Sequence, residues 1–160
     1  MENKDKTFNI LFCGIGGQGV LKASEICGLA AIYDGYNAKK SEVHGMSQRG
    51  GSVESHLRFG KDVYSPLIPL GRADFLVSFF LEEQQRMKFF LKKDGIDLIS
   101  YLEKAESQIS DKRLINTYLL GVLSKYLPIK EESWLKAINN AFNKLQDKNI
   151  EIFLSGRNEK

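Results

Sequence analysis

A chain of 160 residues that is 42% apolar and 27% charged has the size and composition of one globular domain, which excludes a disordered or fibrous protein. Its 23 basic and 20 acidic residues are mixed along the sequence, so the net charge of +3 does not indicate nucleic-acid binding. No apolar run reaches the roughly 20 residues of a membrane-spanning helix, and the polar start of the chain is unlike a signal peptide. We expect a single cytoplasmic domain over residues 1–160, with no membrane contact.

An apolar strand at residues 9–13 runs directly into a glycine-rich turn that contains Gly14, Gly16, Gly17 and Gly19. The spacing matches the dinucleotide-binding fingerprint, in which backbone N–H groups at a helix N-terminus hold a pyrophosphate. Glycines at such a turn also let a helix pack closely on a strand without any ligand. The motif alone therefore leaves a binding role and a packing role open.

A helix and two strands are predicted after this turn. Apolar residues recur at helical spacing over residues 20–34, until Gly35 ends the helix. Residues 36–43 then form a second strand, which completes a βαβ unit whose parallel strands end at the same edge of the sheet. Residues 52–59 form a third strand. Its outward-facing candidates are Glu54, His56 and Arg58.

The rest of the chain is predicted to alternate between strands and helices. Residues 60–62 resemble a hairpin turn, and Pro66 and Pro69 keep residues 64–69 out of a central strand. The later elements are a buried strand at residues 73–80, a helix at 81–92, a short strand at 95–100, a helix or ordered loop at 101–109, and helices at 115–126 and 131–145. This order predicts a three-layer α/β/α domain with a mixed, mainly parallel sheet.

A second glycine-rich loop, residues 44–51, returns to the edge where the first glycines lie. It contains His44, Gln48, Arg49, Gly50 and Gly51. In one interpretation the two loops bind NAD, with Glu42 on the ribose, although Lys39 and Lys40 beside this acid obscure that role and no second mononucleotide-binding half is visible. In the other interpretation, the loops and Arg49 form an anion-tolerant surface that functions only when another chain covers it.

Residue patterns for chemistry by this chain alone are missing from the sequence. Neither His44 nor His56 has a Ser or Cys nucleophile in a local motif, and no His, Asp and Glu residues have metal-ligand spacing. Cys13 and Cys27 lie in apolar segments and are expected as buried free thiols, and the chain has no Cys-x-x-Cys motif for zinc or iron. We therefore predict no catalytic residue and no metal ligand in this chain.

Three motifs, taken in this order, resemble one known family. They are Ile15-Gly16-Gly17-Gln18-Gly19, Ser41-Glu42-Val43-His44-Gly45-Met46-Ser47-Gln48-Arg49-Gly50-Gly51-Ser52 and Tyr64-Ser65-Pro66-Leu67-Ile68-Pro69. Together they are similar to the gamma-type domain of ferredoxin-dependent 2-oxoacid oxidoreductases. Residues 42–51 most resemble the beta (small) subunit of indolepyruvate ferredoxin oxidoreductase, and residues 116–121 and 128–134 resemble the family's C-terminal helices. Between Gly95 and Leu114 this sequence is shorter than typical members.

The resemblance implies a subunit that does not act alone. The complex would oxidatively decarboxylate a 2-oxoacid, an aryl-pyruvate such as indolepyruvate, and pass the acyl group to coenzyme A and the electrons to ferredoxin. Thiamine diphosphate, Mg and [4Fe–4S] clusters would belong to a thiamine-binding partner subunit, so that this chain alone binds no cofactor. A nucleotide-binding (NAD-type) oxidoreductase domain and a regulatory or scaffolding module of the same fold remain alternatives.

The candidate cofactor-binding residues lie on the two glycine-rich loops. They are Gly14, Gly16, Gly17, Gln18, Gly19, His44, Gln48, Arg49, Gly50 and Gly51. The planar guanidinium of Arg49 is suited to paired hydrogen bonds with a phosphate of coenzyme A or with a carboxylate of the partner. We expect Arg49 at the coenzyme A entrance or at the interface that shapes this entrance.

Overall fold

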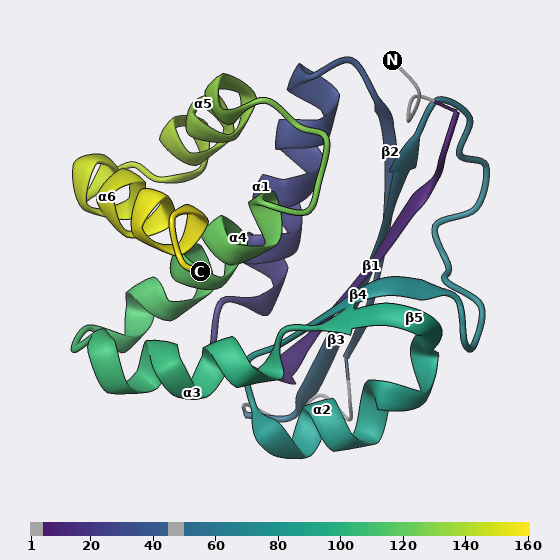
Figure 1. The fold of residues 1–160 in the computed structure, drawn as a ribbon, viewed down its shortest axis with the longest axis horizontal. Helices are drawn as coiled ribbons and strands as arrows, with labels where there is room; N and C mark the ends of the chain where they lie inside the picture. Colours follow the sequence, from purple (N-terminus) through teal and green to yellow (C-terminus); the bar gives the residue numbers. More distant parts are fainter. Residues whose placement is uncertain (1–4, 45–49) are drawn as a thin grey trace.

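A computed structural model describes residues 5–44 and 50–160 of the chain, and it contains a five-stranded sheet with helices on both faces (Figure 1). The strands are β1 (Phe8–Ile15), β2 (Asn37–His44), β3 (Ser52–Gly60), β4 (Ala73–Ser78) and β5 (Leu91–Asp97). The helices are α1 (Val20–Tyr33), α2 (Leu81–Met87), α3 (Ile99–Gln108), α4 (Ile115–Ser124), α5 (Glu131–Ala141) and α6 (Gln146–Arg157), with short 3-10 helices η1 (Lys88–Phe90) and η2 (Lys112–Leu114).

The order of the strands in the sheet is β2-β3-β1-β4-β5. β3 lies between β1 and β2 and is antiparallel to both, whereas β4 is parallel to β1 and β5 is parallel to β4. Four of these strands therefore point the same way and β3 runs against them, which confirms the predicted mixed sheet. The segment between β2 and β3 is too short for the crossover that parallel neighbours need, so β3 has to reverse direction.

The register of the strands brings the two glycine-rich loops to one edge of the sheet. Ile15 pairs with Ser52 and His44 pairs with Val53, so β1 and β2 end where β3 begins. β1 and β2 are parallel, as the predicted βαβ unit requires, but β3 is inserted between them. The common edge is the lower one in Figure 1.

The hairpin turn predicted at residues 60–62 is wrong. β3 pairs with β2 and β1, and β4 lies on the other side of β1. Because β1 takes the position that a β3–β4 hairpin would need, residues 61–72 have to pass β1 before the chain returns, antiparallel to β3, as β4. No residue from 61 to 72, all of them described, belongs to a strand, in agreement with the two prolines of this segment.

The sheet is covered unequally on its two faces. α1 packs on β1, β2 and β3, and α4, α5 and α6 lie beyond it on the same face, whereas α2 packs against β1 and β4 on the opposite face (Figure 1). Side chains of β1 alternate accordingly: Ile10 and Phe12 join the larger core, and Leu11 and Cys13 join a smaller core with Met87. This arrangement confirms the three-layer α/β/α prediction.

Several element boundaries differ from the prediction, and the short strand expected at residues 95–100 is β5, which begins four residues earlier and ends at Asp97. The helix expected at residues 81–92 ends at Met87, because residues 91–97 pair with β4 as strand β5. The helix expected to end at residue 145 stops at Ala141, and α6 follows as a separate helix that apolar spacing did not indicate. Within the described ranges, no helix has both the length and the apolar composition needed to cross a membrane.

Candidate functional site

The end of β1 and the turn that leads into α1 need glycines for two different reasons. Gly19, the residue before α1, has a φ of 79°, a left-handed conformation that glycine adopts without strain. Gly14 has no room for a side chain, because a Cβ there would lie 2.7 Å from Oε1 of Gln18 and 2.8 Å from Cγ2 of Val20. The turn is therefore tightly folded, as both the packing and the binding interpretations require.

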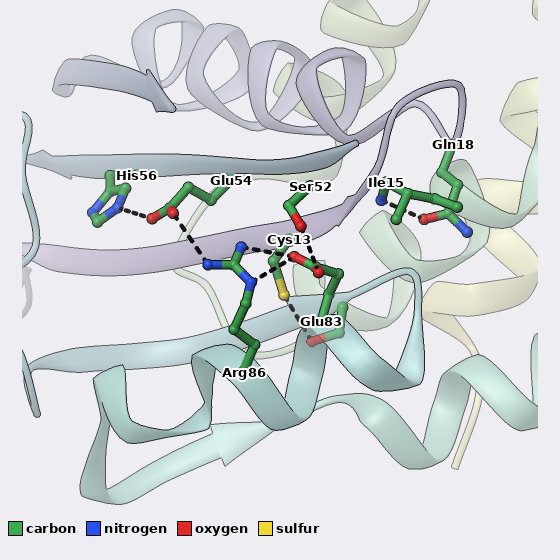
Figure 2. Close-up of polar contacts among 9 residues, drawn as sticks. Cys13, Ile15, Gln18, Ser52, Glu54, His56, Glu83 and Arg86 are labelled. Carbon is green, nitrogen blue, oxygen red and sulfur yellow. Dashed lines mark hydrogen bonds and ion pairs between the residues drawn. The ribbon is translucent and has the colours of Figure 1, made fainter. Parts of the chain in front are cut away.

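Gln18 closes this turn from the inside. Its Oε1 accepts a hydrogen bond from the N–H of Ile15 at 2.9 Å (Figure 2). The next N–H, that of Gly16, donates to the carbonyl oxygen of Gly51 at 2.9 Å. Two backbone donors that could hold a pyrophosphate are thus already used by the protein, which favours the packing interpretation for this half of the turn.

The bond between Gly16 and Gly51 also joins the two glycine-rich loops. A Cβ on Gly16 would lie 3.2 Å from the backbone nitrogen of Gly50, so the two backbones leave little space for a side chain. Of the ten candidate residues, the structure brings together Gly14, Gly16, Gly17, Gln18, Gly19, Gly50 and Gly51, with His44 beside them at the end of β2. Gln48 and Arg49 lie outside the described residues.

A pocket of about 300 Å³ lies where these loops meet. Its lining residues are Ile15, Gly16, Gly17, Gly19, Val20, Leu21, Lys22, His44 and Val53. His44 is exposed, and its Nε2 lies 4.0 Å from Oε2 of Glu42.

Glu42 is the candidate ribose ligand of the NAD interpretation, and its Oε1 lies 2.9 Å from Nζ of Lys40. This ion pair engages the carboxylate and disfavours that interpretation.

Five polar side chains form a connected network on the α2 face of the sheet, and sequence patterns did not indicate it. We call it the Glu83 network; its members are Ser52, Glu54, His56, Glu83 and Arg86 (Figure 2). Ser52 Oγ donates to Glu83 Oε1 at 2.8 Å, and Arg86 donates to Glu83 Oε2 at 2.7 Å. Arg86 also lies 3.8 Å from Glu54 Oε1. The network fastens α2 to the start of β3, directly beside the second glycine-rich loop.

His56 forms the far end of this network and is buried, so its predicted outward position is wrong. The N–H of Ile68 donates to Nδ1 at 3.1 Å, which leaves Nε2 to donate to Glu54 at 2.8 Å in the neutral ring. The ring of Phe90 packs edge-on against His56 at 5.5 Å. Residues 61–72 and η1 therefore cover the side of β3 that alternation alone suggested was open to water.

Arg86, Cys13 and Cys27 have raised pKa values. The hydrogen bond with Glu83 raises the pKa of Arg86, which keeps the guanidinium charged. Burial raises the pKa of the Cys13 thiol to about 12, and burial also raises the pKa of Cys27. Both cysteines are buried free thiols, as predicted, and neither is the thiolate that nucleophilic attack requires. Among residues 5–44 and 50–160, no three or more His, Cys, Asp or Glu side chains are placed to hold a metal ion.

One known protein family matches the part of the chain that contains this candidate site. Residues 9–106, which include both glycine-rich loops and the Glu83 network, match the family described as Pyruvate ferredoxin/flavodoxin oxidoreductase. The chain belongs to this family. The resemblance inferred from the three sequence motifs is thereby confirmed at the family level.

Three similar proteins match this chain over different fractions of its length. Over 91 residues the chain is 48% identical to the protein named Indolepyruvate oxidoreductase subunit IorB from Thermococcus kodakarensis, a match that covers 57% of this chain and 45% of that relative. A keto/oxoacid ferredoxin oxidoreductase gamma subunit from Geobacter sulfurreducens PCA has a TM-score of 0.75 at 23% identity, covering 93% of this chain and 95% of that chain. A 2-oxoglutarate:ferredoxin oxidoreductase from Magnetococcus marinus, with 2-oxoglutarate, coenzyme A and succinyl-CoA bound, has a TM-score of 0.79 at 18% identity, covering 96% of this chain and 31% of that chain. The two solved structures show that the fold is shared.

Proposed function

We propose that this chain is the small, gamma-type subunit of a 2-oxoacid ferredoxin oxidoreductase whose substrate is an aryl-pyruvate such as indolepyruvate. The observation that carries the proposal is 48% identity over 91 residues to a relative named as an indolepyruvate oxidoreductase subunit, within the matched family. The complex oxidatively decarboxylates the 2-oxoacid, transfers the acyl group to coenzyme A and passes the electrons to ferredoxin.

The residues of this chain support placing the redox cofactors in a partner subunit. A [4Fe–4S] cluster is commonly held by four thiolates, whereas this chain has two cysteines, both buried and protonated. We assign the clusters, thiamine diphosphate and its Mg to a thiamine-binding partner. Thiamine diphosphate supplies the electron sink for decarboxylation, and the clusters carry the electrons towards ferredoxin.

The proposed contribution of this chain is the edge formed by its two glycine-rich loops, which we place against the partner and coenzyme A. Lys22 and His44 line the pocket at this edge, and Arg49 belongs to the same loop as Gly50 and Gly51. Basic side chains suit the phosphates of coenzyme A. Because Ile15 and Gly16 donate to protein oxygens, we propose that the first turn shapes this edge and that side chains provide the anion contacts.

Reconstitution under anaerobic conditions tests this function. The isolated chain is expected to be colourless and inactive, because its described residues include no nucleophile and base pair and it lacks thiolates for iron. Adding the thiamine-binding subunit should give ferredoxin reduction that requires both an aryl-pyruvate and coenzyme A. Oxidation of the 2-oxoacid by the isolated chain with an artificial acceptor would contradict the proposal.

A pair of glycine variants tests the role of the loop edge in the assembled complex. Gly16→Val should push the two loops apart, because even a Cβ at this position would lie 3.2 Å from the Gly50 nitrogen. We expect a raised KM for coenzyme A or failed assembly. Gly28→Ala on α1 is the control, since the nearest atom to its Cβ would be at an ordinary 3.4 Å. If both variants match the parent in assembly and in KM, the loop edge has no part in coenzyme A use.

A further inference from the structure

A second pocket, of about 360 Å³, lies between the end of β4 and helices α3 and α4. Its lining residues are Gln18, Phe79, Phe80, Leu81, Leu102, Glu106, Lys112 and Ile115. None of these residues lines the pocket between the glycine-rich loops. The volume falls within the range of about 300–1,000 Å³ that is usual for small-molecule sites.

The place of this pocket in the fold is one where open α/β sheets bind ligands. The chain leaves β1 through α1 on one face of the sheet and leaves the adjacent parallel strand β4 through α2 on the other face. The crevice outside the carboxyl ends of such a strand pair is the topological switch point. Gln18 follows β1 and Phe79 follows β4, so the pocket opens at this point.

Five of the eight lining residues are apolar, and Gln18 contributes a side-chain amide to the lining. Phe79, Leu102 and Ile115 are at most 9% exposed, whereas Leu81 is 56% exposed. Gln18 uses its amide oxygen to close the glycine turn, and its amide nitrogen lies on the side away from the Ile15 nitrogen (Figure 2). That nitrogen has no hydrogen-bond partner among the residues that the structure describes, so it can donate to a ligand.

Two opposite charges complete the lining. Glu106 on α3 and Lys112 in η2 are both exposed, and neither forms an ion pair with any residue of the described ranges. A ligand with only a negative charge would face Glu106, and one with only a positive charge would face Lys112. A zwitterion satisfies both groups, with its carboxylate towards Lys112 and the Gln18 amide and its ammonium towards Glu106.

We propose that this pocket binds a free α-amino acid with a large apolar side chain, which packs against Phe79, Leu102 and Ile115. The zwitterionic head contacts Gln18, Glu106 and Lys112. All eight lining residues belong to this chain, so binding can be measured without the other subunits, and this proposal and the proposed oxidoreductase function can fail separately.

Nuclear magnetic resonance titration of the 160-residue chain tests the proposal with three probes: L-phenylalanine, 3-phenylpropionate, which lacks the amino group, and phenethylamine, which lacks the carboxylate. L-Phenylalanine should perturb the Gln18 side-chain amide and residues 79–81, and the other two should bind about fivefold more weakly. Glu106→Gln should abolish the preference over 3-phenylpropionate, and Lys112→Met the preference over phenethylamine. Both positions are exposed, so these variants should fold, and Glu151→Gln on α6, outside the pocket, is the matched control.

Three results would overturn the proposal. One is no saturable perturbation by L-phenylalanine at about 10 mM, well above the Kd expected for a small-molecule site. Another is equal binding of 3-phenylpropionate and L-phenylalanine to the parent chain, which would make this an anion site. The third is perturbation of the same residues by coenzyme A and not by L-phenylalanine, which would assign the pocket to the coenzyme.

Discussion

Glu83 holds two elements together at the candidate site through its single carboxylate. One oxygen accepts from Ser52 at the start of β3 and the other from Arg86 on α2, and the side chain is only 8% exposed. Removing this acceptor leaves Ser52 without its partner and Arg86 without its nearest counter-charge. Because Arg86 is 44% exposed, water replaces part of what is lost.

We therefore expect Glu83→Ala to lower the free energy of unfolding by about 1–3 kcal/mol, measured by urea denaturation. Glu151→Gln is the control, because its ion pair with Lys148 lies on the surface at 3.6 Å and should contribute less than about 1 kcal/mol. Equal effects of the two substitutions would show that the Glu83 network does not stabilise the fold.

Sequence patterns located the glycines of this site but not the side chains that support them. The glycine spacing and the apolar strand before it are local signals, and they predict the turn correctly at Gly16 to Gly19, whereas Gly14 still belongs to β1. The Glu83 network depends on contacts between residues about 30 positions apart, such as Ser52 and Glu83. Strand alternation placed Glu54 and His56 on one side of β3, but nothing in it shows that residues 61–72 cover that side.

The crossing of α4 and α6 brings two helix backbones into direct contact. A Cβ on Gly121 would lie 2.1 Å from the carbonyl oxygen of Phe153, and one on Gly156 would lie 2.1 Å from that of Tyr118. Both glycines thus serve close approach within helices, where their conformational freedom would otherwise be unfavourable. This contact also explains why α6 was missed, because its buried positions are Asn149, Phe153 and Gly156, and only Phe153 is strongly apolar.

Gly121→Ala should separate these helices and reduce the free energy of unfolding by about 3 kcal/mol, since backbone atoms cannot yield as a side chain does. Gly28→Ala is a matched helical control: its Cβ meets only Leu57 at 3.4 Å, and alanine favours the helix by about 1 kcal/mol. The measurement is urea denaturation of the parent and both variants. If Gly121→Ala is as stable as Gly28→Ala, the two helices do not depend on this close contact.

At the scale of the whole molecule, the order and type of most helices and strands could be predicted from the sequence. Which strands lie next to each other in the sheet could not. Apolar periodicity is set within each segment, and it identified β1, α1, β2, β3, β4 and α4 close to their observed bounds. The insertion of β3 between β1 and β2 depends on which strands meet in space. The failed hairpin at residues 60–62 and the shortened α2 are both errors of this kind.

The last residues of the chain connect α3, α4 and α6, and this connection should make stability depend on pH. The carboxylate of Glu159 contacts Lys104 and accepts from Tyr118 Oη at 2.6 Å, and both bonds lower the pKa of Glu159. A carboxyl group with a lower pKa in the folded chain stabilises the fold above its unfolded pKa. That contribution is lost as the pH falls through the folded pKa.

Glu159→Gln should therefore be less stable than the parent at neutral pH, and the difference should shrink as the solution is made acidic. Urea denaturation of both proteins over a series of pH values measures this difference in the free energy of unfolding. A difference that stays constant down to acidic pH would show that the charge of Glu159 is not what stabilises the C-terminal helices.

The reversed strand β3 has a kinetic consequence for the glycine turn. β1 receives one neighbour from β3 and the other from β4, and the contact between Cys13 and Ser78 spans 65 residues of sequence. Non-local strand pairings of this kind form slowly, because the entropy cost of closing a long loop comes before the stabilising free energy of the contacts. The glycine turn therefore reaches its final shape only after both distant strands have docked on β1, although the residues of the turn itself are neighbours in the sequence.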